Sequence, residues 1–175
     1  MRAFIAFCLF LLLSIPLAAQ KQKHDPLTPD QQDQIAEAGI DPVARVDLYV
    51  KFIDEHAETI RGLIKRAKTP ARAQRLNYEL EDFTTLLDEF GDNLDVFSER
   101  EADVRKSLKI LNGGVARWQS VLHDLPSEPG FDLALKDAQA SMNELAAQAK
   151  QLTSNQEAYF KEHPDEKNQD RAEPK

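Results

Sequence analysis

Histidine side chains carry most of the metal-binding and proton-transfer chemistry open to this chain. His24 and His163 lie in polar ends, whereas His56 and His123 lie in segments expected to form the first and third long helices. These helices run parallel in a bundle whose chain direction alternates. Counted from each helix start, the two histidines differ in height by about ten residues, or roughly 15 Å. That separation is too large for the two rings to share a metal ion.

Other motifs of catalytic chemistry are missing from the sequence. It holds no His-x-x-x-His, no Gly-x-Ser-x-Gly, no phosphate-binding glycine loop and no glutamate three residues before a histidine. The acidic pairs Asp54-Glu55 and Asp88-Glu89 are adjacent in sequence, so their side chains diverge on a helix and do not face one bond as an acid and a base. The sequence therefore predicts no enzyme, no catalytic residue and no metal site.

One ligand pair meets a geometric requirement for cofactor binding. Met142 lies about thirteen residues into a helix expected to run antiparallel to the first, and His56 lies about fourteen residues into the first, so both stand at nearly the same height. In this respect the chain is similar to exported four-helix bundles that hold a b-type haem between a methionine and a histidine. The resemblance implies that His56 and Met142 would ligate the iron. The alternative makes Met142 ordinary core packing and His56 a boundary residue, and we favour that interpretation, with no cofactor.

Residues 1–19 have the composition of a secretory signal peptide. A basic start at Arg2 precedes an almost wholly apolar stretch from Ala3 to Ile15, and small residues up to Ala19 offer a cleavage site. The apolar stretch of about thirteen residues is shorter than the roughly twenty that span a bilayer, although an uncleaved N-terminal anchor is the alternative. Cys8 is the only cysteine, so a processed chain would have no thiol. We expect an exported protein, periplasmic or extracellular, with no membrane insertion after cleavage.

Without this segment about 156 residues remain, the size of one ordinary domain. Loss of Arg2 leaves 21 basic against 30 acidic residues, a net charge of −9. Nucleic-acid binding rests on clustered Lys and Arg, so this balance argues against a nucleic-acid partner and weakens any case for docking on an anionic membrane. Such acidity is typical of solvated helix surfaces.

Residues 20–40 are predicted to form a polar linker and one short helix. Thr28-Pro29-Asp30-Gln31 has the Thr-x-x-Gln form of a capping box with proline at the first helical position. Gly39 is a stop signal, so the predicted helix runs from Pro29 to Ala38.

Residues 41–160 carry apolar side chains at alternating three- and four-residue spacing, the pattern of helices with one buried face. Asp41-Pro42 and Thr69-Pro70 are helix starts, and Pro126 to Gly130 is a turn. The longest seam consists of Ala73, Leu76, Leu80, Phe83, Leu87, Phe90, Leu94, Phe97, Val104, Leu108, Leu111, Val115, Trp118, Leu122 and Leu125. We predict an all-α, antiparallel up-down-up-down four-helix bundle preceded by a short helix, with a disordered charged tail over 161–175.

The long seam needs a break, because one helix from Pro70 to Leu125 would be about 84 Å long. Gly91-Asp92-Asn93 is one candidate. We prefer Ser98-Glu99-Arg100-Glu101, because Ser-x-x-Glu is a capping box and would explain Glu101 as the single polar position of the seam. This choice predicts three successive helices of about 27 residues each.

Two adjacent glycines, Gly113 and Gly114, interrupt the helix predicted after this break. Each costs on the order of 1 kcal/mol relative to alanine in a helix interior. Close contact with a facing helix, or a local kink beside Trp118, is the interpretation we prefer, and a notch for a ligand is the alternative.

A short motif occurs near each end of the chain. Leu27-Thr28-Pro29-Asp30-Gln31 and Leu152-Thr153-Ser154-Asn155-Gln156 both match Leu-Thr-x-x-Gln, and two copies in a small exported helical chain resemble the periplasmic stress chaperones named for that motif. The resemblance implies a thin, cradle-shaped helical dimer that holds unfolded clients. The chain departs from the family in the 125-residue separation of the copies and in its acidity, where the family's client-binding surface is typically basic.

These observations favour a non-enzymatic extracytoplasmic helical bundle that acts through protein contacts, either as a self-associating scaffold or as an accessory to an envelope complex. An envelope chaperone or stress sensor of the Leu-Thr-x-x-Gln type is the first alternative. A haem-binding bundle that uses His56 and Met142 is the second.

Overall fold

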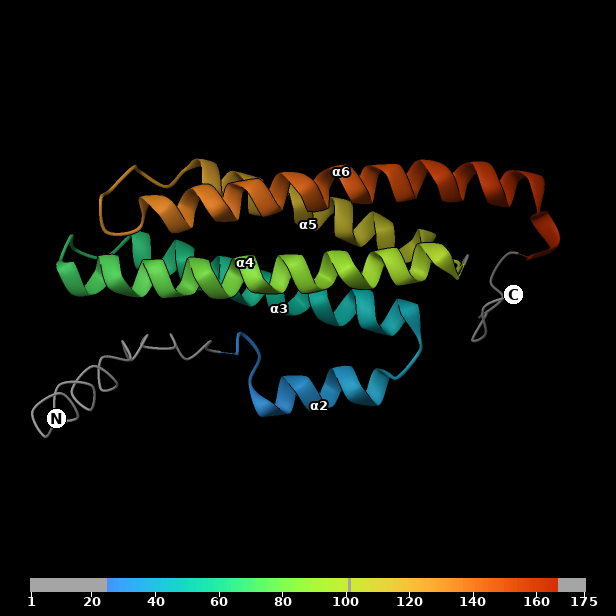
Figure 1. The fold of residues 1–175 in the computed structure, drawn as a ribbon, viewed down its shortest axis with the longest axis horizontal. Coiled ribbons are helices and arrows are strands. Elements are labelled where there is room, and N and C mark those ends of the chain that lie inside the picture. The colour runs from blue at the N-terminus through green and yellow to red at the C-terminus, as the bar shows by residue number, and fades with distance from the viewer. Residues whose placement is uncertain (1–24, 101, 167–175) are drawn as a thin grey trace, which may run out of the picture.

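The computed structural model describes residues 25–100 and 102–166, which are helical apart from short connections (Figure 1). The predicted signal peptide, residues 1–19, lies outside the described residues. No helix in the described part of the chain is both long enough and apolar enough to cross a membrane. The α-helices of this part are α2 (Pro29–Ala38), α3 (Pro42–Ile64), α4 (Pro70–Glu99), α5 (Arg105–His123) and α6 (Asp132–Glu162).

The three helix starts predicted at prolines are confirmed. Thr28 caps α2 through a complete capping box with Gln31, Asp41 accepts two backbone amide hydrogen bonds at the start of α3, and Thr69 accepts one at the start of α4. Each cap satisfies amide groups that have no partner within the helix. Helix α2 ends at Gly39, where a φ of 56° favours a residue without a Cβ.

The predicted break at Ser98 is wrong by several residues. Ser98 lies in the last turn of α4, and α5 begins at Arg105 after Val104, a residue without a capping side chain. Gln156 of α6 supplies the missing partner, because its side-chain oxygen accepts a hydrogen bond from the Val104 amide at 3.1 Å and its side-chain nitrogen donates to the Ala102 carbonyl. A tertiary contact therefore sets the break where the local capping pattern does not.

The displaced break changes the helix lengths. Helices α3 to α6 have 23, 30, 19 and 31 residues, so the prediction of three successive helices of about 27 residues is wrong. Glu101, with its predicted capping role, lies outside the described residues. Helix α6 continues past residue 160 and a 3₁₀ turn follows at Pro164–Glu166, so the first part of the predicted disordered tail is ordered, and residues 167–175 lie outside the described residues.

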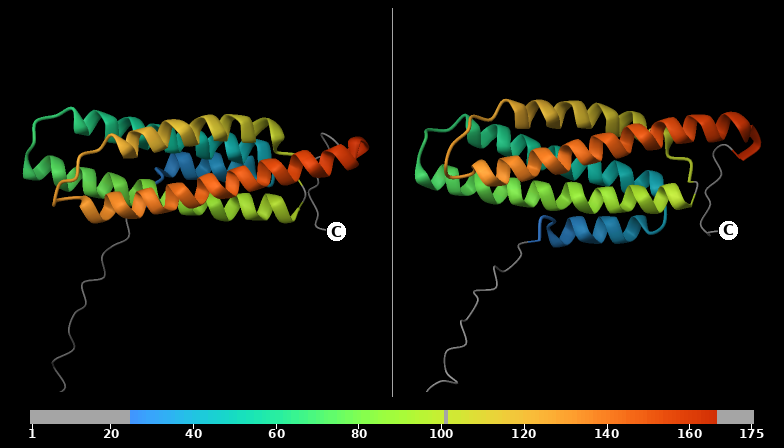
Figure 2. Two further views of the ribbon diagram at one scale, coloured as in Figure 1. Left: turned by 90° about the horizontal axis from the view of Figure 1, so that it is seen from above. Right: turned by 45° about the horizontal axis from the view of Figure 1, so that its top comes forward.

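The chain direction alternates along the four long helices, as in the predicted up-down-up-down bundle (Figure 1). Around the bundle the order is α3, α4, α6, α5, because α3 packs on α4, α4 on α6, α6 on α5 and α5 on α3. The connection from α4 to α5 therefore crosses the end of the bundle diagonally (Figure 2). Helices α3 and α6 occupy opposite corners, α3 and α5 are parallel neighbours, and α2 packs on α3 outside the four-helix core.

One continuous core fills the bundle. Every residue of the predicted seam is buried except Ala73, which is partly buried against the same core. Phe83, Phe90 and Trp118 have no exposed surface. The prediction of a buried seam is therefore confirmed, although the break within it lies elsewhere.

A buried ion pair joins two connections at one end of the bundle. Arg72, at the start of α4, is 5% exposed, pairs with Glu128 of the α5–α6 connection and donates to the Ile64 carbonyl of α3 at 3.4 Å. Lys68 lies 2.9 Å from the other carboxylate oxygen of Glu128. Hydrogen bonds from Arg72 and Lys68 lower the pKa of Glu128. A buried guanidinium needs such a partner, and this pair joins the start of α4 to the α5–α6 connection.

The contact at the glycine pair comes from within α5 and not from a facing helix. A Cβ at Gly114 would lie 2.8 Å from Cζ2 of Trp118, whereas a Cβ at Gly113 would lie 3.6 Å from Nη1 of Arg117. Gly114 therefore makes room for the buried indole, and Gly113 is not needed for internal packing.

Replacing Phe83 by Asp should unfold the domain. The side chain of Phe83 is fully buried on α4, so the new carboxylate would lie in the core without a partner, at a cost of roughly 4 kcal/mol or more. Val96→Asp on the same helix is the matched control, because Val96 is 41% exposed. Thermal melting followed by circular dichroism measures both variants, and wild-type melting of Phe83→Asp would contradict the buried seam.

The glycine pair gives opposite expectations for two alanine substitutions. Gly114→Ala should lower the free energy of unfolding, because the Trp118 ring would have to move. Gly113→Ala should raise it by about 0.5–1 kcal/mol, because alanine is the better helix former. Denaturant unfolding followed by Trp118 fluorescence measures both changes, and a Gly114→Ala variant as stable as Gly113→Ala would show that the indole does not require this glycine.

Candidate functional site

The structure does not bring His56 and Met142 together. His56 lies on α3 and Met142 on α6, the diagonal helices that do not pack against each other. Met142 is buried and borders a small hollow between α5 and α6 that His123 also lines. The predicted equality of height is insufficient, because the diagonal connection places the two helices at opposite corners of the bundle.

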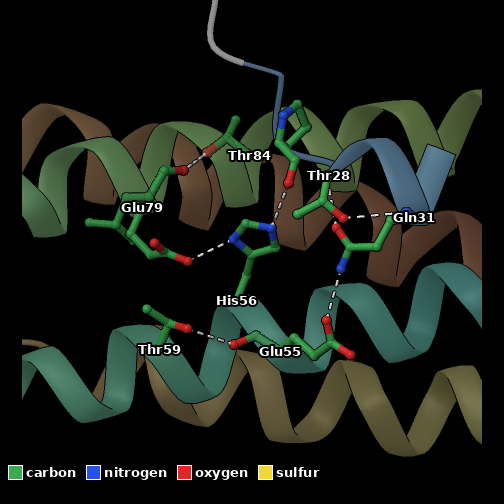
Figure 3. A network of polar contacts seen from close by, with 9 residues as sticks. Thr28, Gln31, Glu55, His56, Thr59, Glu79 and Thr84 are labelled. Atoms are coloured by element: carbon green, nitrogen blue, oxygen red, sulfur yellow. Dashed lines mark hydrogen bonds and ion pairs between the residues drawn. The ribbon is translucent and has the colours of Figure 1, made fainter.

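The His56 ring instead joins three segments at the edge of the bundle (Figure 3). Its Nδ1 lies 2.7 Å from Oε1 of Glu79 on α4, and its Nε2 lies 3.1 Å from the carbonyl oxygen of Pro26 before α2. Both partners accept hydrogen bonds, and an imidazole carries hydrogens on both nitrogens only when it is protonated. The two contacts therefore require the imidazolium form and leave neither nitrogen of His56 for a haem iron.

Burial and charge act in opposite directions on His56. The side chain is 14% exposed, and burial alone would lower its pKa. The hydrogen bond and negative charge of Glu79 raise the pKa, with further contributions from the Pro26 carbonyl and the charge of Asp82, so the net pKa lies above the usual 6.5. His56 and Glu79 thus form an ion pair that holds the segment before α2.

The first Leu-Thr-x-x-Gln copy holds the same segment at a second point (Figure 3). The Thr28 amide donates to Oε1 of Gln31 at 2.8 Å, and Nε2 of Gln31 donates to Oε2 of Glu55 on α3 at 2.9 Å. Leu27 is buried in the core cluster. This copy therefore begins α2 and fixes it to α3.

The second copy has a different local structure. Leu152, Thr153 and Gln156 lie within α6, well before its end. Leu152 is part of the core, Thr153 donates to the Ala149 carbonyl of its own helix at 2.7 Å, and Gln156 binds the connection between α4 and α5. One copy starts a helix and the other lies inside one, so the two copies do not share a structural role.

The far end of α2 is held by a chain of polar contacts. The Arg45 guanidinium donates to the Gly39 carbonyl at 3.2 Å and to Oδ1 of Asn93 on α4 at 2.8 Å. Asn93 donates to the hydroxyl of Tyr49 at 3.2 Å, and this hydroxyl donates to Glu89 at 2.7 Å. Helix α2 is therefore fixed at both ends.

A shallow groove of about 740 Å³ follows the outer face of α3 beside α5. Its apolar side chains are Val50, which is buried, and Ile110, which is 50% exposed. Its charged side chains are Asp47, Lys51, Asp54, Glu55 and Glu58. The groove is therefore an apolar strip inside a mainly acidic rim.

The acidic residues of the rim follow the period of α3. Asp47, Asp54 and Glu58 are separated by seven and four residues, so they share one helix face over about 16 Å. Asp47 makes no hydrogen bond or ion pair with the described residues, and Glu58 pairs with Arg61 of the next turn, where both side chains are exposed. These carboxylates remain accessible to a partner.

Asp54 connects the groove to the core. Its carboxylate accepts hydrogen bonds from the Trp118 indole at 2.7 Å and from Nη2 of Arg117 at 2.7 and 3.0 Å. Trp118 is fully buried and is the only tryptophan of the chain. A buried ring thus fixes one carboxylate of the groove rim through its N–H group.

Comparison with protein-family models, with curated proteins and with solved structures found no match. The fold defines an all-α four-helix bundle with an accessory N-terminal helix. The resemblance to the Leu-Thr-x-x-Gln chaperones stays a prediction. Within residues 25–100 and 102–166, no group of three or more His, Cys, Asp or Glu side chains is arranged to hold a metal ion.

Sequence reasoning missed the groove. The available signal was Ile110, an aliphatic residue beside the seam positions Leu108 and Leu111 but out of their register. Asp47 and Asp54, at one heptad spacing on α3, were the second signal. Neither signal indicates that α3 and α5 are neighbours, which follows only from the diagonal connection.

His56 should make the stability of the fold depend on pH. A folded-state pKa above 6.5 means that the ion pair with Glu79 contributes fully below pH 6.5 and that this contribution is lost as pH rises through the folded-state pKa. We expect the melting temperature of the wild type, relative to His56→Gln, to fall as the pH rises above 6.5 and through the folded-state pKa of His56. His123→Gln is the control, because the His123 side chain is 90% exposed. Parallel pH profiles of the wild type and His56→Gln would contradict the ion pair.

Proposed function

We propose that this chain is an exported, non-enzymatic helical bundle that acts by binding protein on the face formed by α3 and α5. One observation carries the proposal: Ile110 is half exposed in a groove whose rim is charged. An apolar strip within a polar rim is typical of protein-binding surfaces. Grooves beside helices commonly accept a partner helix.

The packing of the core supports a function at the surface. Phe83, Phe90 and Trp118 have no exposed surface, so a ligand in the bundle interior would have to displace close-packed side chains. The haem alternative is not pursued, because both ring nitrogens of His56 already contact protein oxygens.

Export is part of the proposal on the basis of sequence alone. The basic start, the apolar stretch and the small residues before Gln20 have the order of a signal peptide. A processed chain would lack Cys8 and so would hold no thiol to react in an oxidising compartment.

Site-specific crosslinking from the groove tests the proposed function. A photoreactive amino acid at position 110 of the full chain should form a discrete crosslink in its native host, and mass spectrometry identifies the second component. The same amino acid at position 133 is the control, because Leu133 is 72% exposed on α6, away from the groove. Binding of the identified protein, purified, should weaken roughly tenfold or more with Ile110→Asp.

Three outcomes would contradict this function. Position 110 could give no specific crosslink, or it could give only those that position 133 also gives. A binding affinity unchanged by Ile110→Asp would likewise place the contact elsewhere.

A further inference from the structure

We infer that the groove on α3 binds helix α5 of a second copy of this chain, so that two copies pair through their α3/α5 faces. The inference rests on the proposed function and names the partner. It follows from the juxtaposition of an acidic α3 face and a basic α5 face on either side of Ile110.

The groove requires a cationic partner. Arg117 already pairs with Asp54 at 2.7 Å, which leaves Asp47 without a partner among the described residues and Glu58 with one exposed pair. An uncharged or acidic surface over these carboxylates would remove their water and offer no positive charge in its place. A partner with basic side chains on both sides of an apolar residue supplies that charge.

Helix α5 has this composition on its outer face. Lys106, Lys109 and Arg117 are exposed around Ile110, and the two lysines make no ion pair with the described residues. Gly113 lies on the same face, where it is not required by packing within the chain and leaves space for a close helix. The span from Lys106 to Arg117 is eleven residues, as is the span from Asp47 to Glu58, so both faces extend over about 16 Å.

The register between the two helices is set within one copy. Asp54 contacts both Arg117 and Trp118, and α3 and α5 are neighbours that run parallel. Seven residues earlier on both helices, Asp47 therefore stands level with Ile110 and Leu111. A two-fold axis parallel to the helices and between them places α3 of one copy over α5 of the other at the same height. Asp47 then stands level with Ile110 of the second copy and about 1.5 Å, one residue, from the height of Lys109. The two Ile110 side chains lie near the axis.

The overall charge of the chain does not prevent this pairing. The chain carries −8 in total, but charges beyond a Debye length of about 8 Å are largely screened at physiological salt. Opposite charges brought together at the interface interact at shorter range. The connection between α3 and α4, residues 65–69, is also rich in basic residues. It is not helical, so its side chains do not repeat with the period of the acidic residues on α3.

Analytical ultracentrifugation of the processed full chain over a range of concentrations tests the inference. We expect a monomer–dimer equilibrium, with the dimer dissociation constant raised roughly tenfold or more by Ile110→Asp, by Asp47→Lys and by Lys109→Glu. The double variant Asp47→Lys with Lys109→Glu exchanges the charges and should restore association. Leu133→Asp and Glu144→Lys, on the exposed surface of α6, are the matched controls and should associate as the wild type does.

Together with the crosslinking experiment, these results distinguish failure of the dimer inference from failure of the proposed function. A chain that stays monomeric at every concentration, or a dimer that the groove variants leave intact, overturns the inference. If position 110 nevertheless crosslinks a different protein, the proposed function stands without it. Failure of position 110 to capture either a second copy or another protein overturns both. Circular dichroism and Trp118 fluorescence confirm that each variant is folded.

Discussion

The order of the helices depends on a connection that crosses the end of the bundle, and the buried side chain of Gln156 makes this crossing possible. The connection brings the Val104 amide and the Ala102 carbonyl into the interior, where an unpaired backbone group costs about 1–3 kcal/mol. A side-chain amide carries a donor group, the NH2, and an acceptor group, the carbonyl oxygen, in a fixed geometry. Gln156 uses both, so α4 and α5 can stand at opposite corners and still be consecutive in the chain.

The diagonal crossing decides which chemistry the surface can hold. It makes α3 and α5 parallel neighbours, which sets the acidic positions of one helix beside the basic positions of the other. It also separates α3 from α6, so the helices that carry His56 and Met142 do not pack against each other. The same constraint therefore removes the predicted ligand pair and creates the groove around Ile110.

Features encoded locally could be predicted, and features encoded by contacts between distant residues could not. Thr28, Asp41 and Thr69 are each followed directly by proline and cap their own helix, so pattern alone located three helix starts. The start of α5 has no capping side chain, and its partner lies 52 residues away in Gln156. Ser98 carries a local capping pattern, but α4 continues through it to Glu99, and the contacts of Gln156 set the start of α5.

Helix α2 lies outside the four-helix core and is held to it by both apolar and polar contacts. Leu27 and Ile35 are the residues that this segment contributes to the core cluster, so apolar burial alone gives it a narrow contact. Polar contacts from His56 and Arg45 at the two ends of this segment add to its small apolar contact.

Two further side chains of α3 contact α2. Glu55 accepts a hydrogen bond from Gln31 of α2, and Lys51 donates to Gln34 of α2 at 3.4 Å. Both of these α3 side chains also line the groove. The contacts that hold α2 therefore share Lys51 and Glu55 with the charged rim of the groove, so release of α2 would free two side chains of that rim.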